Sequence, residues 1–276
     1  MSDKHTLLDP FLQAQRFVVL DGALATELEV RGADLNHALW SAKLLNENPE
    51  LIKQVHLDYL HAGANVITTA TYQASFLGFE NQGYTKEAAI RLMQLSLNIA
   101  ADARSAFMNS NQVNPLLKPV IAASVGPYGA AKADGSEYTG YQNVSIEQLM
   151  EFHQERLVLI QQTEADIIAF ETIPCLDEAI AIKNLLAEQP SKKAWVSFSC
   201  KDEKHLCSGE LFEDAVKVLN DSKEIVGIGV NCTPPQYIES LIKIAQPITG
   251  KTIMVYPNND KILKCDDYTY CFIENK

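Results

Sequence analysis

Residues 166–172 read DIIAFET: four apolar residues follow Asp166, and the run ends in an acid, Glu171, and a threonine, Thr172. A short, continuous apolar run is typical of a strand that is covered on both faces, as in a parallel sheet. Six further runs of this kind occur along the chain, at residues 17–20, 65–69, 119–124, 194–199, 225–230 and 252–256. The sequence therefore predicts seven buried, parallel strands.

Helical patterns separate these runs. Asn48 precedes Pro49 and an apolar periodic segment, and an Asn cap followed by Pro at the first helical position predicts a helix start. Ser145 and Gln148 form a capping-box pattern that opens a second helix. Shorter amphipathic helices are expected at residues 176–186, 211–219 and 236–244. Strict alternation of strand and helix leaves two architectures, a (β/α)8 barrel and a doubly wound sheet.

The strand ends favour the barrel. A barrel builds one central site from many loops, whereas an open sheet concentrates its polar groups at one switch point. Polar side chains stand at or just after the C-terminal end of nearly every predicted strand: Asp21, Thr69, Thr71, Ser124, Glu171, Thr172, Ser199, Cys200, Asn231, Cys232 and Asn258. The predicted fold class is α/β, a TIM-type (β/α)8 barrel formed by a single domain of residues 1–276.

The last residues depart from the pattern. After Tyr256 the chain reads PNNDKILKCDDYTYCFIENK, without an apolar strand followed by a helix. We therefore expect the barrel to be truncated before its eighth unit, with residues 1–16 as an N-terminal extension and residues 259–276 as a divergent tail. A ring that lacks one unit exposes two strand edges unless the tail or a partner covers them.

The composition indicates small-molecule substrates. A net charge of -12 and a pI near 4.9 argue against nucleic acid as a partner, because phosphate-backbone binding uses concentrated Lys and Arg. No apolar run approaches the roughly 20 residues that cross a bilayer, and the N-terminus has no secretory pattern. We expect a cytoplasmic protein that does not act on membranes. The six cysteines lack CxxC spacing, so free thiols, core residues or metal ligands are favoured over disulfides.

Three strand-end residues are candidates for chemistry, and each has a structural alternative. Asp21 before Gly22 is either a ligand-binding acid or an ordinary turn residue. Glu171 at the end of an apolar strand needs a cation, such as a substrate ammonium, unless it caps a helix or braces a loop. Cys232 is either a small core residue or one ligand of a zinc site that needs three or four.

Other polar positions carry weaker signals. Ser124 opens the segment SVGPYG, whose glycines allow the backbone to approach a ligand closely or simply form a turn. His56 and His61 lie five residues apart and therefore on different helix faces, which favours packing roles over metal binding. Lys201 is surrounded by charged residues, unlike a lysine that forms Schiff bases, so an aldolase or lyase is the less favoured alternative.

Taken together, the chain resembles the homocysteine S-methyltransferases, particularly the bacterial branch that uses S-methylmethionine. The resemblance runs in order through seven segments: LDGALATELEVRG (20–32), LWSAKLLNENPELIKQVHLDYLHAGA (39–64), TYQASFLGF (71–79), SVGPYGAAKADGSEYTGY (124–141), FETIP (170–174), GVNC (229–232) and VYPN (255–258). It implies a barrel that moves a methyl group from S-methylmethionine or S-adenosylmethionine to homocysteine, giving methionine.

The resemblance also implies roles for individual residues. Cys232 matches the first of three zinc ligands, and Asp21 and Glu171 match acids that hold the substrate amino group. Ser124, Thr172 and Asn231 are further expected substrate-binding residues. Zinc deprotonates a bound thiol, which leaves the homocysteine sulfur ready to attack the donor methyl group.

The chain departs from the family at its end. The other two zinc ligands belong to a C-terminal GGCC motif that is absent from this sequence, and Cys265 and Cys271 do not align with it. Two functions therefore stay open: a zinc-dependent methyltransferase, and a catalytically impaired, truncated homologue that binds a small molecule or another subunit. The sequence does not select the methyl donor or the oligomeric state.

Overall fold

The computed structural model describes residues 7–35, 39–110, 114–189, 192–258 and 272–274. All seven predicted strands are confirmed at their expected places. They are β1 (Phe17–Val19), β2 (Val66–Thr68), β3 (Val120–Val125), β4 (Ile167–Ile173), β5 (Ala194–Phe198), β6 (Ile225–Asn231) and β7 (Thr252–Tyr256).

The predicted helices are also confirmed, together with their start signals. The Asn48 side chain accepts a hydrogen bond from the backbone N–H of Leu51, and both hydrogen bonds of the capping box at Ser145 and Gln148 are present. The helices are α1 (Asp9–Gln15), α2 (Leu24–Val30), α3 (Trp40–Glu47), α4 (Pro49–His61), α5 (Phe76–Asn81), α6 (Lys86–Ser110), α7 (Tyr128–Lys132), α8 (Ile146–Gln161), α9 (Leu176–Glu188), α10 (Phe212–Asn220) and α11 (Pro235–Ala245), with 3-10 turns η1 (Pro115–Leu117) and η2 (Ser136–Tyr138). In the described part of the chain, no helix is both long and apolar enough to span a membrane.

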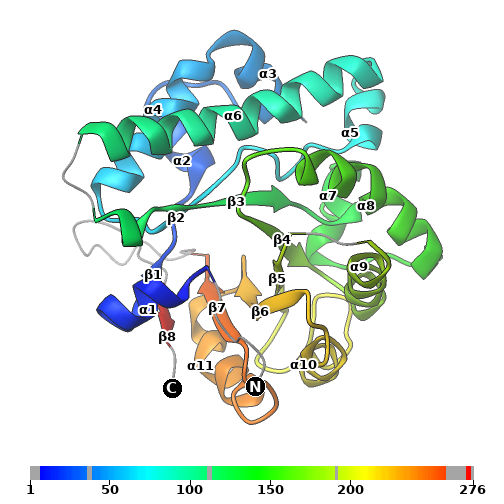
Figure 1. Cartoon of the computed structure of the whole chain (residues 1–276). Coiled ribbons are helices and arrows are strands. Elements are labelled where there is room, and N and C mark those ends of the chain that lie inside the picture. Colours follow the sequence, from blue (N-terminus) through cyan, green and yellow to red (C-terminus); the bar gives the residue numbers. More distant parts are fainter. Residues whose placement is uncertain (1–6, 36–38, 111–113, 190–191, 259–271, 275–276) are drawn as a thin grey trace.

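The strands form a curled, parallel sheet with the helices on its outer side (Figure 1). Strands β2 to β7 pair in chain order, and every pair is parallel. At the other edge β1 joins β2 through a parallel bridge between Leu20 and Val66 and a 2.9 Å hydrogen bond from Asp21 N to Val66 O. The C-terminal ends of seven strands therefore meet at one mouth, as the barrel prediction requires.

An eighth strand comes from the tail. Residues Phe272–Glu274 form β8, which pairs with β1 in the antiparallel direction and also lies next to β7. The tail pattern did not predict this strand, because a run of three residues is too short to show a periodicity. The strand occupies the gap between β1 and β7, yet its direction differs from that of a parallel eighth unit.

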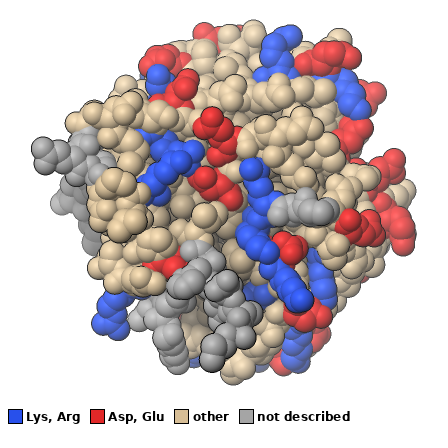
Figure 2. Space-filling view, in the orientation of Figure 1, with Lys and Arg blue, Asp and Glu red and all other residues tan. Residues whose placement is uncertain are grey.

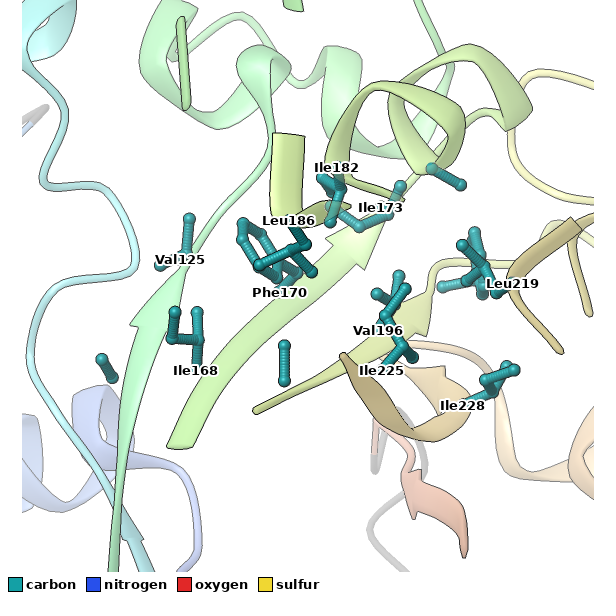
Figure 3. Packing of buried hydrophobic residues seen from close by; sticks show 14 of the residues in the cluster. Val125, Ile168, Phe170, Ile173, Ile182, Leu186, Val196, Leu219, Ile225 and Ile228 are labelled. Carbon is teal, nitrogen blue, oxygen red and sulfur yellow. The ribbon is translucent and has the colours of Figure 1, made fainter. Parts of the chain in front are cut away.

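The two faces of the sheet bury different side chains, because neighbours along a strand point to opposite faces. On the outer face, Ile168 and Phe170 of β4 pack with Ile182 and Leu186 of α9 (Figure 3). On the inner face, Ile167 and Ala169 of β4 join a cluster that includes Trp195 and Met254 and is covered by Leu8 and Phe11 around α1. Glu171 is the next residue of β4 on the same inner face as Ile167 and Ala169. Because side chains alternate between the two faces, Glu171 points to the inner side at the mouth.

Candidate functional site

A bulge at the end of β4 places two consecutive side chains in the same mouth. The register between β4 and β5 shifts between Phe170 and Ile173, and Thr172 has a φ of 62°. A left-handed conformation is costly for a β-branched residue, on the order of 1–3 kcal/mol, and such strain gathers at functional sites. In a regular strand Glu171 and Thr172 would face opposite sides of the sheet. The bulge instead lets both take part in the site.

Two carboxyl groups form one side of the mouth. Asp21 follows β1 and accepts hydrogen bonds from the backbone N–H of Thr68, at 2.7 Å, and from the Thr68 hydroxyl, at 3.0 Å. The Ser124 hydroxyl donates to Glu171. Both carboxylic side chains are 8% exposed. Asp21, Glu171 and Ser124, which the sequence predicts as substrate-binding residues, thus belong to one buried group.

Burial dominates the protonation of these acids. It raises the pKa of Asp21 from 3.8 to about 8, against the lowering effect of the Thr68 hydrogen bonds, and the nearby Glu171 adds to the rise. Burial also raises the pKa of Glu171, while the hydroxyl groups of Ser124 and Tyr256 lower it. Among the described residues, no Lys, Arg or His is a leading cause of either pKa shift. The pair is therefore prepared to receive a cation that would favour the ionised forms.

A second polar group surrounds the Cys232 sulfur. Asn231 donates through Nδ2 to the Thr172 hydroxyl at 2.8 Å and to the Cys232 sulfur at 3.3 Å. The Asn231 Oδ1 accepts from the Thr172 backbone N–H at 2.7 Å, which fixes the bulge of β4 against the end of β6. The Thr172 hydroxyl also approaches the sulfur, at 3.6 Å. Cys232 is thus held among polar groups and not in the hydrocarbon core.

The thiol and the carboxyl pair influence each other. Burial raises the pKa of the Cys232 thiol, and the Glu171 carboxylate raises it further, whereas Thr172, Tyr138 and Asn231 lower it. Glu171 and Thr172 are neighbours in the chain, so the bulge is the link between the two groups. All the predicted site residues therefore meet at the C-terminal ends of β1, β3, β4 and β6.

Several site residues were not predicted. The Tyr256 hydroxyl, at the end of β7, contacts Ser197 and accepts from Trp195 Nε1 at 3.1 Å, and burial raises its pKa well above 10. Tyr72, after β2, and Tyr138, in η2, lie near Cys232. Tyr256 ends a predicted strand, Tyr72 follows one, and Tyr138 lies in the family segment 124–141. Their positions in the sequence could therefore have indicated that they belong to the site.

The described residues do not by themselves fit a zinc site. Cys232 supplies one thiol, and in the described ranges no group of three or more His, Cys, Asp and Glu side chains could hold a metal ion. Zinc is normally bound by four ligands, of which at least three come from the protein. Cys265 and Cys271 lie outside the described residues.

The residues judged less suited to catalysis lie elsewhere. His56 is fully buried, and burial lowers its pKa to about 4, while His61 is exposed and contacts the Phe107 ring edge-on. Lys201 is exposed on the loop after β5. These positions agree with the packing and surface roles that the sequence favours.

A buried polar network holds the loop after β3 in place. Glu178 of α9 is fully buried and accepts from the Tyr128 backbone N–H at 2.8 Å. The Nε2 atom of His153 lies 2.8 Å from Glu178, and the Nδ1 atom lies 2.9 Å from the Arg156 guanidinium. Arg156 donates to the Gly126 carbonyl at 3.1 Å. These contacts tie the loop that carries Tyr138 to helices α8 and α9.

Charged groups of both signs share the surface. Figure 2 shows Lys and Arg side chains interspersed with Asp and Glu over one face of the molecule.

Comparison with known proteins decides the family. The family model for homocysteine S-methyltransferase matches residues 18–270. The chain belongs to the homocysteine S-methyltransferase family. This finding confirms the resemblance seen in the sequence, and it places the mouth described above in a family of enzymes.

Individual relatives agree with this assignment. The chain is 50% identical over 250 residues to homocysteine S-methyltransferase YbgG of Bacillus subtilis (strain 168), with 90% of this chain and 79% of the relative covered. It is 44% identical over 252 residues to selenocysteine Se-methyltransferase of Brassica oleracea var. italica, with 88% and 73% covered. The metallated form of the homocysteine methyltransferase MmuM from Escherichia coli matches with a TM-score of 0.88 and 39% identity, covering 93% of this chain and 88% of that one.

Proposed function

We propose that this protein transfers a methyl group from a sulfonium donor, S-methylmethionine or S-adenosylmethionine, to homocysteine, giving methionine. The observation that carries the proposal is the arrangement of the mouth, where a buried carboxyl pair stands beside a thiol that is surrounded by polar groups. This arrangement lies at the C-terminal strand ends of a chain that belongs to a family of S-methyltransferases. The carboxyl pair suits an amino acid's ammonium group, and the sulfur-lined side suits the reacting sulfur.

The bonds balance without an added oxidant or reductant. The homocysteine thiol loses its proton, and a lone pair of its sulfur attacks the donor methyl carbon. A new carbon–sulfur bond forms while the bond from that carbon to the sulfonium breaks. The bonding electrons remain on the donor sulfur, which becomes a neutral thioether.

The site residues would position the acceptor for this attack. Asp21 and Glu171 would bind the ammonium group, and Ser124 orients the Glu171 carboxyl. Asn231 and Thr172 hold the Cys232 side of the mouth at a fixed distance from the pair. Holding two reactants in the right geometry can supply about 7–11 kcal/mol of the barrier to a transfer between two bound molecules.

Zinc remains a prediction that rests on the family resemblance. Cys232 is its proposed ligand, and because the described residues offer no complete ligand set, no step above is assigned to the metal. We further propose, from the sequence, that residues 1–276 form a single homocysteine-binding barrel domain and that the protein acts in the cytoplasm.

Activity and metal content test the proposal together. We expect the purified chain to form methionine from homocysteine and S-methylmethionine, and to hold zinc by mass spectrometry that is lost in Cys232→Ala. Absence of turnover with both sulfonium donors, in protein shown to be folded, would contradict the proposed function.

A second candidate follows from the incomplete ligand set. The chain would then be a catalytically impaired homologue that binds an amino acid or another subunit. Methionine binding without turnover, zinc-free protein and an unchanged affinity in Cys232→Ala would favour this candidate over the enzyme.

A further inference from the structure

Two buried polar atoms near the mouth have no hydrogen-bond partner among the described residues. They are the Tyr72 hydroxyl oxygen, on the loop after β2, and the Glu137 Oε2 atom, in η2. The Thr172 side chain lies near the Tyr72 hydroxyl but does not form a hydrogen bond of ordinary geometry with it. An unpaired buried polar group is unfavourable, and in native proteins each such group needs an explanation, such as a catalytic role or a bound ion or water.

The two atoms belong to one neighbourhood. Tyr72 is within electrostatic range of Cys232, Tyr138 and Glu137, and the Tyr138 hydroxyl interacts with the Cys232 sulfur. Tyr138 is 48% exposed, so it stands at the rim of the mouth. Glu137 acts electrostatically on Tyr72 and Tyr138, whereas the Asp21–Glu171 pair reaches the Cys232 sulfur through Glu171.

The backbone of Glu137 is fixed, which gives its carboxylate a defined place. The Ser199 hydroxyl donates to the Glu137 carbonyl at 2.9 Å. Gly129 allows the close approach on the other side, because a Cβ atom there would lie 2.6 Å from the Glu137 N atom. The glycines at 135 and 140, with φ values of 79° and 76°, allow the chain to turn into and out of this short segment.

We propose that Glu137, together with Tyr72 and Tyr138, binds the cationic methyl donor beside Cys232, at a place separate from the Asp21–Glu171 pair. The proposal rests on the proposed function and extends it to the second substrate. A carboxylate oxygen accepts hydrogen bonds only, so its missing partner is a donor or a cation. Aromatic rings beside a carboxylate suit an ammonium or sulfonium group, which is attracted to both.

This placement also satisfies the chemistry of the transfer. Both substrates carry an ammonium group, and the Asp21–Glu171 pair can serve only one of them. In-line attack places the methyl carbon between the accepting sulfur and the sulfonium sulfur, so the rest of the donor extends beyond the methyl group and away from the accepting sulfur. A second acid, Glu137, in addition to the Asp21–Glu171 pair provides separate places for the two cations.

Donor kinetics in Glu137→Gln test the proposal. At saturating homocysteine, we expect the KM for S-methylmethionine to rise by about ten- to a hundredfold, since a charge-assisted contact is lost, while the KM for homocysteine changes less than about twofold. Glu203→Gln is the matched control, because it removes one acid from an exposed loop at the same end of the barrel. The control is expected to match the wild type for both substrates.

A donor without an ammonium group shows which cation Glu137 contacts. With (2-carboxyethyl)dimethylsulfonium, a small effect of Glu137→Gln assigns the contact to the ammonium, and an equal effect assigns it to the sulfonium. Both results support the proposal. Because Glu137 Oε2 has no hydrogen-bond partner among the described residues that the substitution could remove, thermal unfolding of the variant is expected to be unchanged or shifted upward.

The failure of this proposal differs from the failure of the proposed function. If the wild type forms methionine and Glu137→Gln keeps the wild-type KM for S-methylmethionine, or raises the KM for homocysteine instead, the donor assignment is overturned. If the wild type does not turn over, direct calorimetric binding of S-methylmethionine still decides: equal affinity in wild type and variant overturns the assignment, and a selective loss supports it.

Discussion

Binding of an amino acid at the Asp21–Glu171 pair should release protons. With a pKa of about 8, Asp21 is about nine-tenths protonated in the free protein at pH 7. An ammonium group favours the ionised carboxylate, so binding should drive off about 0.9 proton from Asp21 alone. Ionising Asp21 at pH 7 costs about 1.4 kcal/mol. Because the ionised fraction of Asp21 grows as the pH approaches its pKa, the affinity should rise about ninefold between pH 6 and pH 7.

Methionine is the ligand to use, because it has the ammonium group of homocysteine but no thiol that would release a second proton. Calorimetry in two buffers of different ionisation enthalpy, at pH 7, gives the number of protons released. Asp21→Asn should release about 0.9 proton fewer than the wild type and should lose the matching part of the pH dependence. Any release that remains reports Glu171, whose pKa burial also raises.

The matched control is Asp177→Asn, which changes an exposed acid at the start of α9. It should release as many protons as the wild type. Equal release by the wild type and Asp21→Asn, or no release by the wild type at pH 7, would refute the assignment of the buried pair to the substrate ammonium.

Three predictions concern folding. Gly229→Ala should destabilise the protein by several kcal/mol in urea unfolding, because the new Cβ would lie 1.8 Å from the Met254 carbonyl oxygen of the neighbouring strand; Gly250→Ala, with nothing within 4 Å, should change stability by less than about 0.5 kcal/mol. Glu178→Ala should cost about 3–5 kcal/mol, because it leaves buried partners unpaired, and a loss under 1 kcal/mol would show that the network adds little. His56 has a pKa of about 4 in the folded protein, below the unfolded value of 6.5, so its stabilising contribution is complete above pH 6.5 and is lost as the pH falls towards 4. His56→Leu should therefore flatten the acid side of the stability–pH curve, and an unchanged curve would contradict the buried, neutral state.

The sequence was sufficient for the seven parallel strands and for naming Asp21, Glu171 and Cys232 as candidate site residues. Continuous apolar runs marked the seven strands, because strands covered on both faces cannot alternate with polar residues. Asp21, Glu171 and Cys232 were found because each interrupts or ends such a run. The family segments then predicted the family that the comparisons confirm.

What the sequence did not predict depends on backbone geometry. The bulge at Thr172 directs the side chains of Glu171 and Thr172 toward the same mouth. No local pattern in the segment FETIP indicates that Thr172 has a φ of 62°. Tyr72 and Tyr138 reach the site from loops whose course is set by Gly126, Gly129 and the Glu178 network. Helix α6 is a different case: its Ala, Leu and Met content is typical of a helix, and a sum of helix propensities would have indicated it.

The most direct test of the account is a doubly labelled transfer. The protein is incubated with deuterated homocysteine and S-methylmethionine whose methyl groups carry carbon-13, and the products are measured by mass spectrometry. We predict methionine that contains both the deuterated chain and a labelled methyl group, formed by the wild type and lost in Cys232→Ala and in the double variant Asp21→Asn/Glu171→Gln. Doubly labelled methionine at wild-type rate from either variant would contradict the claim that this mouth is where the methyl group is transferred.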